Sequence, residues 1–186
     1  MHFFKTAIGA GIAVLAVPAL ARTAQEIVSD IKALTERTST IKGSASQLTT
    51  VSVIQWHRND GALKTTTDGY NTIIEMIARD IKYLADKKTI TTDDDAKSIS
   101  AAFNDFNNAQ GTLTSVMKNK SDIKNAFPPL GKQMGDMMRG FQKAYEGYVI
   151  ALSNYDASPS KGMNKALYKD KAALSPQLAL VSGTWG

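Results

Sequence analysis

Few residues of this 186-residue chain have the types and spacing that catalysis or metal binding requires. The chain has no cysteine and only two histidines, which excludes disulfides, a thiol nucleophile and a histidine-rich metal cage. His57 stands near Asp60, but no G-x-S-x-G or S-x-x-K motif supplies a nucleophile for it, and Asn59-Asp60-Gly61 is typical of a turn. We therefore expect no enzymatic activity and no cofactor.

The acidic residues also favour a structural interpretation. Asp93, Asp94 and Asp95 are consecutive, whereas a calcium loop needs oxygen ligands at alternate positions, a central glycine and a closing glutamate. Three acids directly after Thr92 are typical of a helix start, where the helix dipole favours negative charge. The other acids alternate with lysines at helical spacing, as on exposed helix faces, although a pair of carboxylates that meet in space stays open.

Basic residues give the chain a formal net charge of +5 and a pI near 9.3. They gather in two groups: Lys118, Lys120, Lys124 and Lys132, and Lys161, Lys165, Lys169 and Lys171. The sequence has no recognised nucleic-acid motif, and its aromatic residues do not alternate with these lysines. We expect no nucleic-acid partner; the two groups indicate solvated faces or contact with an anionic surface.

Methionine and aromatic side chains carry the strongest functional signal. Because methionine is flexible and polarizable, it is favoured where a surface must adapt to varied apolar partners. The pattern indicates either a methionine-padded core or an adaptable cavity for a hydrophobic ligand, and both predict the same positions. The candidate ligand-binding residues are Ile74, Ile77, Ile81, Phe103, Phe106, Leu113, Met117, Met134, Met137, Met138, Phe141, Tyr145, Tyr148 and Leu152.

Four stripes of apolar residues, stepping by four and three, predict four long helices. The stripes are Ile27, Ile31, Leu34, Thr38, Ile41, Ala45, Leu48; Leu63, Thr67, Tyr70, Ile74, Ile77, Ile81, Leu84; Ile99, Phe103, Phe106, Gln110, Leu113, Met117; and Leu130, Met134, Met137, Phe141, Ala144, Tyr148, Leu152, Tyr155. No alternating strand pattern competes with them. We expect an all-α fold, an elongated up-and-down bundle of four long helices and a shorter fifth.

The connections between these helices have their own signals. Residues 51–60, with Trp56, favour a short helix followed by a turn, and Lys87 and Lys88 are expected to close the second helix. Pro128-Pro129 can open a helix but not continue one. The last segment, 161–174, has a weaker pattern, and we expect Pro176 to end it.

The first 21 residues have the features of a secretory signal peptide. Lys5 supplies the positive start, an apolar run spans residues 7–17, and Ala19-Leu20-Ala21 supplies small residues at a cleavage site. The run is too short for a membrane anchor, so we expect a released protein of residues 22–186 in one domain, not an integral membrane protein. Asn119 begins a glycosylation sequon, which we expect near a helix end.

The segments RTAQEIVSDIKAL (residues 22–34) and IKYLADKK (81–88), followed by the aspartates before Ala96, resemble the fungal hydrophobic surface-binding protein A family. This family includes the cell-wall galactomannoprotein (mannoprotein) antigens of moulds. The resemblance covers residues 22 to about 155. It implies a secreted helical domain with a hydrophobic interior that holds a long-chain fatty acid or adsorbs to hydrophobic surfaces. It also implies partners such as a secreted polyester hydrolase.

Two functions of different classes follow from these observations. The first is a secreted, non-enzymatic protein that sequesters fatty acids or similar amphiphiles, or adsorbs to hydrophobic surfaces, with possible cell-wall association. The second is an extracellular structural or interaction protein, of the fungal cell wall or a secreted effector. It would have a solid core and a protein or polysaccharide partner, such as a cell-wall polymer. The second predicts a dry, close-packed interior.

Overall fold

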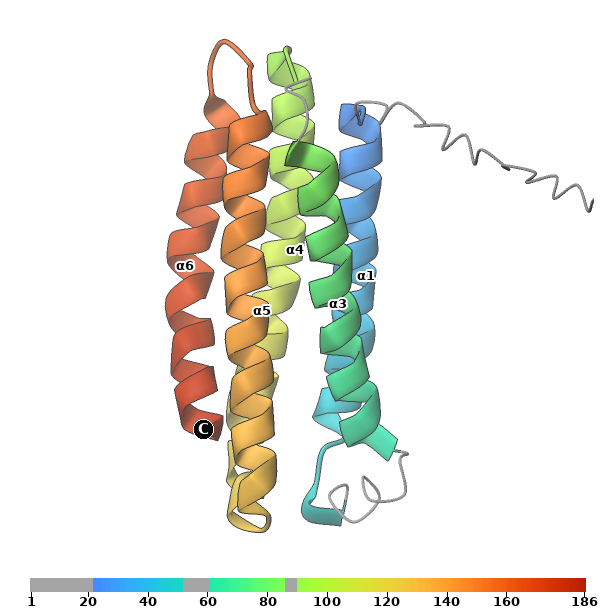
Figure 1. Cartoon of the computed structure of the whole chain (residues 1–186), viewed down its shortest axis with the longest axis vertical. Helices are drawn as coiled ribbons and strands as arrows, with labels where there is room; N and C mark the ends of the chain where they lie inside the picture. Colours follow the sequence, from blue (N-terminus) through green and yellow to red (C-terminus); the bar gives the residue numbers. More distant parts are fainter. Residues whose placement is uncertain (1–21, 52–60, 86–89) are drawn as a thin grey trace, which may run out of the picture.

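The computed structural model describes residues 22–51, 61–85 and 90–186, and within them the chain forms five long α-helices (Figure 1). The helices are α1 (Ala24–Ser46), α3 (Gly61–Ala85), α4 (Asp93–Asn119), α5 (Pro128–Tyr155) and α6 (Gly162–Trp185), with a short 3-10 helix, η1 (Ser121–Asn125), before α5. The described residues form no strand beyond one isolated bridge between Ile90 and Asp156. The all-α bundle predicted from the sequence is confirmed.

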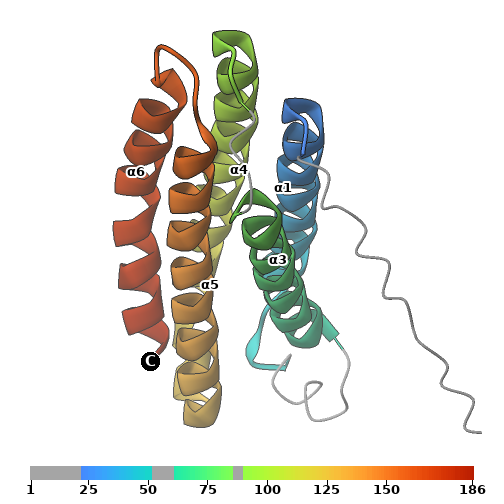
Figure 2. The ribbon, with the colours of Figure 1, turned by 45° about the horizontal axis from the view of Figure 1, so that its top comes forward.

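The five helices form a ring in the order α1, α4, α6, α5, α3, so that each packs mainly against two neighbours. Helices that follow each other in sequence run in opposite directions along the long axis (Figure 1). Helices α4 and α5 also follow each other in sequence, but they are not neighbours and lie on opposite sides of the ring. Turned by 45°, the same ribbon shows α1 and α3 side by side and α5 next to α6 (Figure 2). A ring of this kind encloses a central space that side chains must fill.

Local signals begin three of the described helices, and those of α4 and α5 were predicted from the sequence. Thr23 caps α1 in a capping box with Glu26, since the Glu26 amide donates to Thr23 Oγ1 at 3.2 Å and the Thr23 amide donates to Glu26 Oε2 at 2.7 Å. Thr92 caps α4 by accepting from the Asp95 amide at 3.2 Å. Asp93, Asp94 and Asp95 therefore lie in the first turn of α4, as predicted, and Pro128 opens α5.

The predicted stripes on α1 and α4 are buried at every position, whereas those on α3 and α5 each contain two positions that are only half-buried. Ile74 and Ile81 on α3 are half-buried, and Ile73 and Asp80 are buried instead. On α5, Met137 and Ala144 are likewise half-buried, beside the buried Met138 and Tyr145. Later positions of the same stripes, such as Leu84 and Leu152, are buried, so the half-buried residues lie at the edge of the inward face, where a neighbouring helix covers them only in part.

The prediction that the last helix is short and ends before Pro176 is wrong. α6 continues through Pro176 to Trp185 and, at 24 residues, exceeds the 23 of α1. Proline removes one backbone hydrogen bond, but buried side chains continue beyond it: Leu178, Val181 and Trp185. The Trp185 indole Nε1 donates to the Met117 carbonyl at 3.0 Å, which ties the end of α6 to α4.

Three predictions lie outside the described residues. These are the signal peptide over residues 1–21, the helix and turn over residues 52–60 that include Trp56 and His57, and the closing lysines at 87 and 88. The sequon residue Asn119 is described: it is exposed and is the last residue of α4, so it stands at a helix end as predicted.

Candidate functional site

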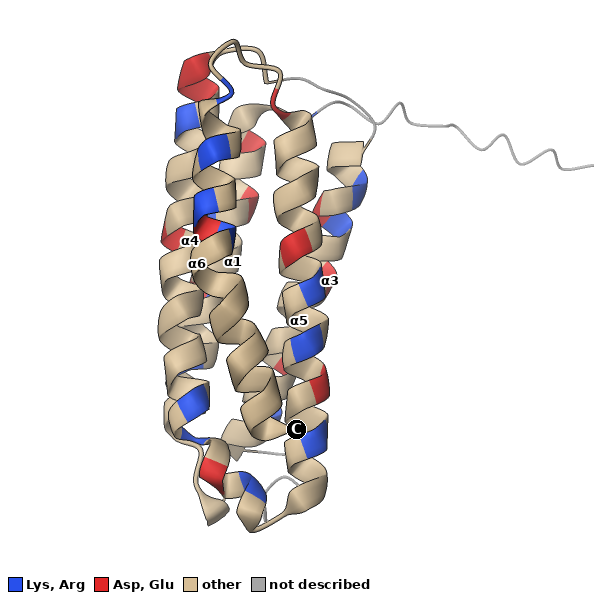
Figure 3. Ribbon diagram, turned by 90° about the vertical axis from the view of Figure 1, so that its left-hand side faces the viewer, with Lys and Arg blue, Asp and Glu red and all other residues tan. Residues whose placement is uncertain are grey.

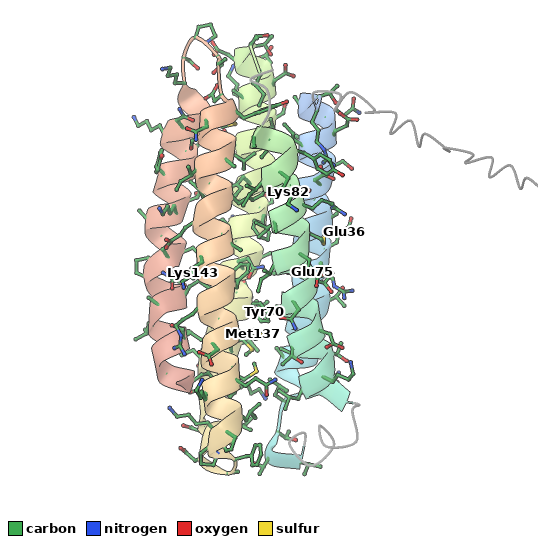
Figure 4. All side chains as sticks on the ribbon, viewed as in Figure 1. Glu36, Tyr70, Glu75, Lys82, Met137 and Lys143 are labelled. Carbon is green, nitrogen blue, oxygen red and sulfur yellow. The ribbon has the colours of Figure 1, made fainter. Side chains whose placement is uncertain are left out.

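Most of the predicted ligand-binding residues meet at the centre of the ring. Eleven of the fourteen are buried: Ile77, Phe103, Phe106, Leu113, Met117, Met134, Met138, Phe141, Tyr145, Tyr148 and Leu152. The other three, Ile74, Ile81 and Met137, are half-buried. Met137 of α5 and Tyr70 of α3 are labelled in Figure 4, and Met137 packs against the core from its partly buried position. The candidates thus divide into a set that fills the centre and a set at the seam between α3 and α5.

Five aromatic side chains, which we call the aromatic cluster, fill the half of the centre nearest the start of α1. They are Phe103, Phe106, Phe141, Tyr145 and Tyr148. The Phe103 ring stacks on the Tyr145 ring with centroids 5.8 Å apart and meets the edge of Phe106 at 6.0 Å. These rings come from α4 and α5, so they join two helices that lie opposite each other in the ring.

The Tyr145 hydroxyl donates to Asn107 Oδ1 at 2.8 Å. Burial, and next the charge of Asp170, raise the pKa of Tyr145. The hydroxyl therefore stays protonated and donates this hydrogen bond at all ordinary pH values. The one polar atom of Tyr145 is satisfied within the protein, which is typical of a structural core residue.

The opposite half of the centre contains what we call the methionine cluster: Leu113, Met117, Met134 and Met138, all buried. They belong to the last turns of α4 and the first turns of α5, which lie at the same end of the bundle (Figure 1). Unbranched methionine side chains adopt many rotamers and fill irregular space. Rearranging the side chains of this half therefore costs less free energy than rearranging those of the aromatic half.

Four buried polar side chains form what we call the polar layer, which begins beside the aromatic cluster and extends into the level of the methionine cluster: Thr38, Tyr70, Gln110 and Thr114. Thr114 follows Leu113 on α4. Gln110 Nε2 donates to Thr38 Oγ1 at 2.7 Å, and Thr38 Oγ1 donates to the Leu34 carbonyl at 2.8 Å. The Tyr70 hydroxyl, Gln110 Oε1 and Thr114 Oγ1 have no hydrogen-bond partner. Burial raises the pKa of the Tyr70 hydroxyl, which therefore stays a neutral donor.

Sequence reasoning placed Thr38, Tyr70 and Gln110 on inward stripes, left out Thr114 and missed that these side chains lie close together along the bundle axis. Thr38, Tyr70 and Gln110 interrupt three different apolar stripes, and this was the available signal. Nothing in the spacing showed that the three interruptions lie at one level of one core. That level depends on how far α1, α3 and α4 are shifted along one another, which is a tertiary property.

Grooves lined by the described residues lie between neighbouring helices. One of about 440 Å³ lies between α4 and α6 and is lined by small and amide side chains such as Asn108, Gly111 and Gln177. Another, of about 400 Å³, lies between α1 and α3 beside Arg37. Of the fourteen candidate residues, only Tyr148 lines one of the grooves described, a narrow one beside Asp80. The other candidates contact one another or neighbouring core residues instead.

An ion cluster closes the aromatic end of the bundle. The Arg22 guanidinium pairs with Asp30 on α1, lies 4.0 Å from Asp80 Oδ1 on α3 and stacks over the Tyr83 ring at 4.3 Å. Asp80 is only 2% exposed, and Arg79 Nε lies 3.5 Å from the same Oδ1. Burial raises the pKa of Asp80, while Arg79 and Arg22 oppose that shift.

Apart from Asp80, Asp156 and Asp170, the charged side chains of the described residues are exposed or half-buried. Figure 3 marks the positions of the charged residues along the ribbon. Lys120 and Lys124 of the first basic group tie segments together, through the carbonyls of Leu48 and Thr184. Lys132 pairs with Asp136 at 2.8 Å. Beyond Lys171, by contrast, α6 carries no charged residue.

Two further findings concern sites and membranes. Within residues 22–51, 61–85 and 90–186, no group of three or more histidines and acids could hold a metal ion. None of the described helices is long and apolar enough to cross a membrane.

The chain was also compared with known proteins. No protein-family model matches it, and neither does any curated protein. The family resemblance in residues 22–34 and 81–88 therefore stands on those sequence segments, and the function rests on the geometry of the core.

Proposed function

We propose that this protein is a secreted, non-enzymatic binding protein that takes up a long-chain fatty acid or a similar amphiphile in the centre of its helical ring. The observation that carries the proposal is the methionine cluster of Leu113, Met117, Met134 and Met138. All four side chains are fully buried in the ring, and three of them are flexible, unbranched methionines. Side chains of this kind can move aside for an alkyl chain by changing from one staggered rotamer to another.

Burial of the alkyl chain supplies the driving force. Each buried methylene contributes about 0.8 kcal/mol before entropy losses, so a long chain needs no charged contact to bind tightly. Because the candidate side chains fill the centre themselves, uptake requires two neighbouring helices to separate. The ligand thus replaces contacts between side chains, and only the surplus appears as affinity.

The seam between α3 and α5 is the best place for that separation. A Cβ added at Gly147 would lie 3.4 Å from Ile81 Cδ1, and one at Gly140 would lie 3.7 Å from Ile74 Cδ1, which are ordinary contact distances. The seams α5–α6 and α1–α3 are tighter: a Cβ at Gly131 would lie 2.5 Å from the Trp185 carbonyl oxygen.

The same comparison at α1–α3 gives 2.4 Å between a Cβ at Gly69 and Ile41 Cγ1. At Gly69 and Gly131 these two seams interlock closely, whereas at Gly140 and Gly147 α5 meets the ends of isoleucine side chains of α3. The half-buried candidates Ile74, Ile81 and Met137 then form the entrance for the ligand.

The outer face of α6 supports adsorption to hydrophobic surfaces as an associated property. Its second half carries no charge, and Leu180 on it is 56% exposed. Small exposed side chains flank Leu180 at Ala173, Pro176 and Ala179. An uncharged, weakly polar face loses little hydration when it meets an apolar surface.

A second candidate function is supported by the aromatic cluster. The centroids of neighbouring rings lie 5.8 to 6.5 Å apart, and the Tyr145 hydroxyl donates a hydrogen bond to Asn107 within the core. A core of this kind is close-packed, as expected of an extracellular interaction protein that uses its surface rather than its interior. The groove between α4 and α6, with its amide and hydroxyl groups, is then the surface to test with polysaccharides.

Native mass spectrometry of the chain from residue 22 to 186, purified without delipidation, tests the leading proposal. We expect adducts at fatty-acid masses that are lost on collisional activation and return when fatty acid is added. Met137→Lys should reduce loading, because a charge at the α3–α5 entrance must be desolvated as the chain passes.

Gln133→Lys is the matched control for that variant. Gln133 is exposed one turn earlier on α5, and the change adds the same charge. Loading should stay at the wild-type level in this control. A mass spectrum that stays free of adducts with excess fatty acid would contradict ligand uptake and favour the interaction protein.

A further inference from the structure

The polar layer contains three atoms that seek hydrogen bonds inside an otherwise apolar core. The Tyr70 hydroxyl, Gln110 Oε1 and Thr114 Oγ1 are each buried and have no partner. Burying a polar group without a partner is unfavourable, and most buried polar groups in native proteins have a hydrogen-bond partner. The layer therefore indicates a binding partner for these atoms.

Contacts between the helices place the three residues within about one helical turn, or about 6 Å, of one another along the bundle axis. Gln110 and Thr114 are one turn apart on α4. Gln110 bonds to Thr38 on α1, and three residues further along α1, Ile41 packs on Gly69, next to Tyr70. Tyr70 also crosses towards α5, where its ring meets the edge of Phe141 at 5.6 Å.

We infer that the polar layer receives the uncharged polar head of the amphiphile, an alcohol or an un-ionised carboxylic acid. This inference rests on the proposed function and specifies its ligand class. A hydroxyl head donates to Gln110 Oε1 and accepts from the Tyr70 hydroxyl, with Thr114 Oγ1 as a second donor. The alkyl chain then extends along the methionine cluster, away from the rigid aromatic cluster.

The surroundings of the layer disfavour a charged head. Tyr70, Gln110, Thr114 and Thr38 are all neutral at ordinary pH. Arg37, the charged residue next to Thr38, lies in the groove between α1 and α3, and its Nη2 donates to Thr72 Oγ1 at 3.4 Å.

The buried acid Asp80 stands ten residues beyond Tyr70, or about 15 Å along α3. The buried Asp170 accepts from the Asn104 side chain, which stands six residues before Gln110 on α4, or about 9 Å away. An ionised head in the layer would therefore have no counter-charge, and its desolvation would oppose binding.

Three ligands with the same alkyl chain test this inference: tetradecanol, tetradecane and tetradecyltrimethylammonium, delivered from cyclodextrin. We expect the wild-type protein to bind tetradecanol about tenfold more tightly than tetradecane and to bind the cation most weakly. Tyr70→Phe should lower the affinity for tetradecanol about tenfold and leave that for tetradecane unchanged. Thr114→Val should act in the same direction.

Stability separates a ligand-binding role from a structural one. Because the Tyr70 hydroxyl lacks a partner in the free protein, Tyr70→Phe should raise the melting temperature or leave it unchanged while it weakens tetradecanol binding. Tyr168→Phe, at an exposed tyrosine of α6, and Thr112→Val, at an exposed threonine of α4, are the matched controls and should alter neither quantity.

The possible failures are distinguishable. Equal affinity for tetradecanol and tetradecane, or unchanged tetradecanol binding in Tyr70→Phe, would overturn the polar-head site while the proposed uptake of hydrophobic ligands stands. A lower melting temperature with equal losses for both ligands would show that the hydroxyl is structural and would also overturn it. Absence of binding by all three ligands would overturn this inference and the proposed function together.

Discussion

The aromatic cluster and the methionine cluster are built from the same two helices, α4 and α5, yet they differ in rigidity. Flat rings with two rotatable bonds make specific stacked and edge contacts, such as Phe103 on Tyr145 at 5.8 Å. Unbranched methionines at 117, 134 and 138 fill their half of the core without directional contacts. One half of the ring is thus suited to hold the bundle together, and the other is suited to change shape.

The largest expected effect concerns the aromatic half. Phe103→Ala should lower the free energy of unfolding by about 4 kcal/mol, because it leaves a cavity among Phe106, Tyr145 and Tyr148. Urea denaturation followed by circular dichroism measures this. Ile150→Ala, at an exposed position of α5, should change stability by less than about 0.5 kcal/mol. A loss below about 1 kcal/mol in Phe103→Ala would show that the aromatic half also yields easily.

The next effect tests whether the α5–α6 seam is rigid even beside the methionine cluster. A Cβ at Gly131 would lie 2.5 Å from the Trp185 carbonyl oxygen, so Gly131→Ala should destabilise the protein by about 2 kcal/mol. Gly111→Ala is the control, because nothing lies within 4 Å of its Cβ. In that variant the better helix propensity of alanine should stabilise the protein by about 0.7 kcal/mol. Thermal unfolding compares the two, and equal melting temperatures would contradict a tight seam.

A smaller effect on the free energy of unfolding depends on pH and comes from Asp80, at the end of the bundle that holds the aromatic cluster. Burial raises the pKa of Asp80 above its ordinary value of 3.8, so the native state holds a proton that the unfolded chain releases. The stability from this group is present below pH 3.8 and is lost as the pH rises through the higher native pKa.

Asp80→Asn cannot titrate, so its free energy of unfolding should fall less than that of the wild type between pH 3 and neutral pH. Denaturant titrations across this range measure the difference. Parallel profiles for the two proteins would show that Asp80 is not desolvated in the native state.

The smallest effect on stability is expected in the methionine half. Met138→Leu conserves volume and should change the free energy of unfolding by no more than about 1 kcal/mol. The same change should narrow the range of alkyl-chain lengths that bind, because leucine has fewer accessible shapes than methionine. Native mass spectrometry with a series of fatty acids checks this. A loss above about 3 kcal/mol would show that the methionines are as closely fitted as the rings.

Much of the fold follows from spacing, but unevenly. Every inward position predicted on α1 and α4 is buried, and Thr92 and Pro128 begin their helices as expected. On α3 the same spacing placed Ile74 and Ile81 in the core, whereas they lie against Gly140 and Gly147 of α5. The positions of the neighbouring helices decide which side of a helix is covered. The spacing of apolar residues along that helix does not reveal those positions.

Residue order by itself determined four of the five long helices, the cap of α4 and most of the apolar positions of the candidate site, because these depend on groups within one or two turns of each other. Only the tertiary structure decided the order of helices round the ring, the continuation of α6 past Pro176 and the position of Tyr70, Gln110 and Thr114 within about one turn of each other along the bundle axis. Each depends on contacts between distant segments: Trp185 bonds to the Met117 carbonyl, and Gln110 bonds to Thr38. Such contacts override local propensity because buried area and satisfied polar groups outweigh the preference of a single residue.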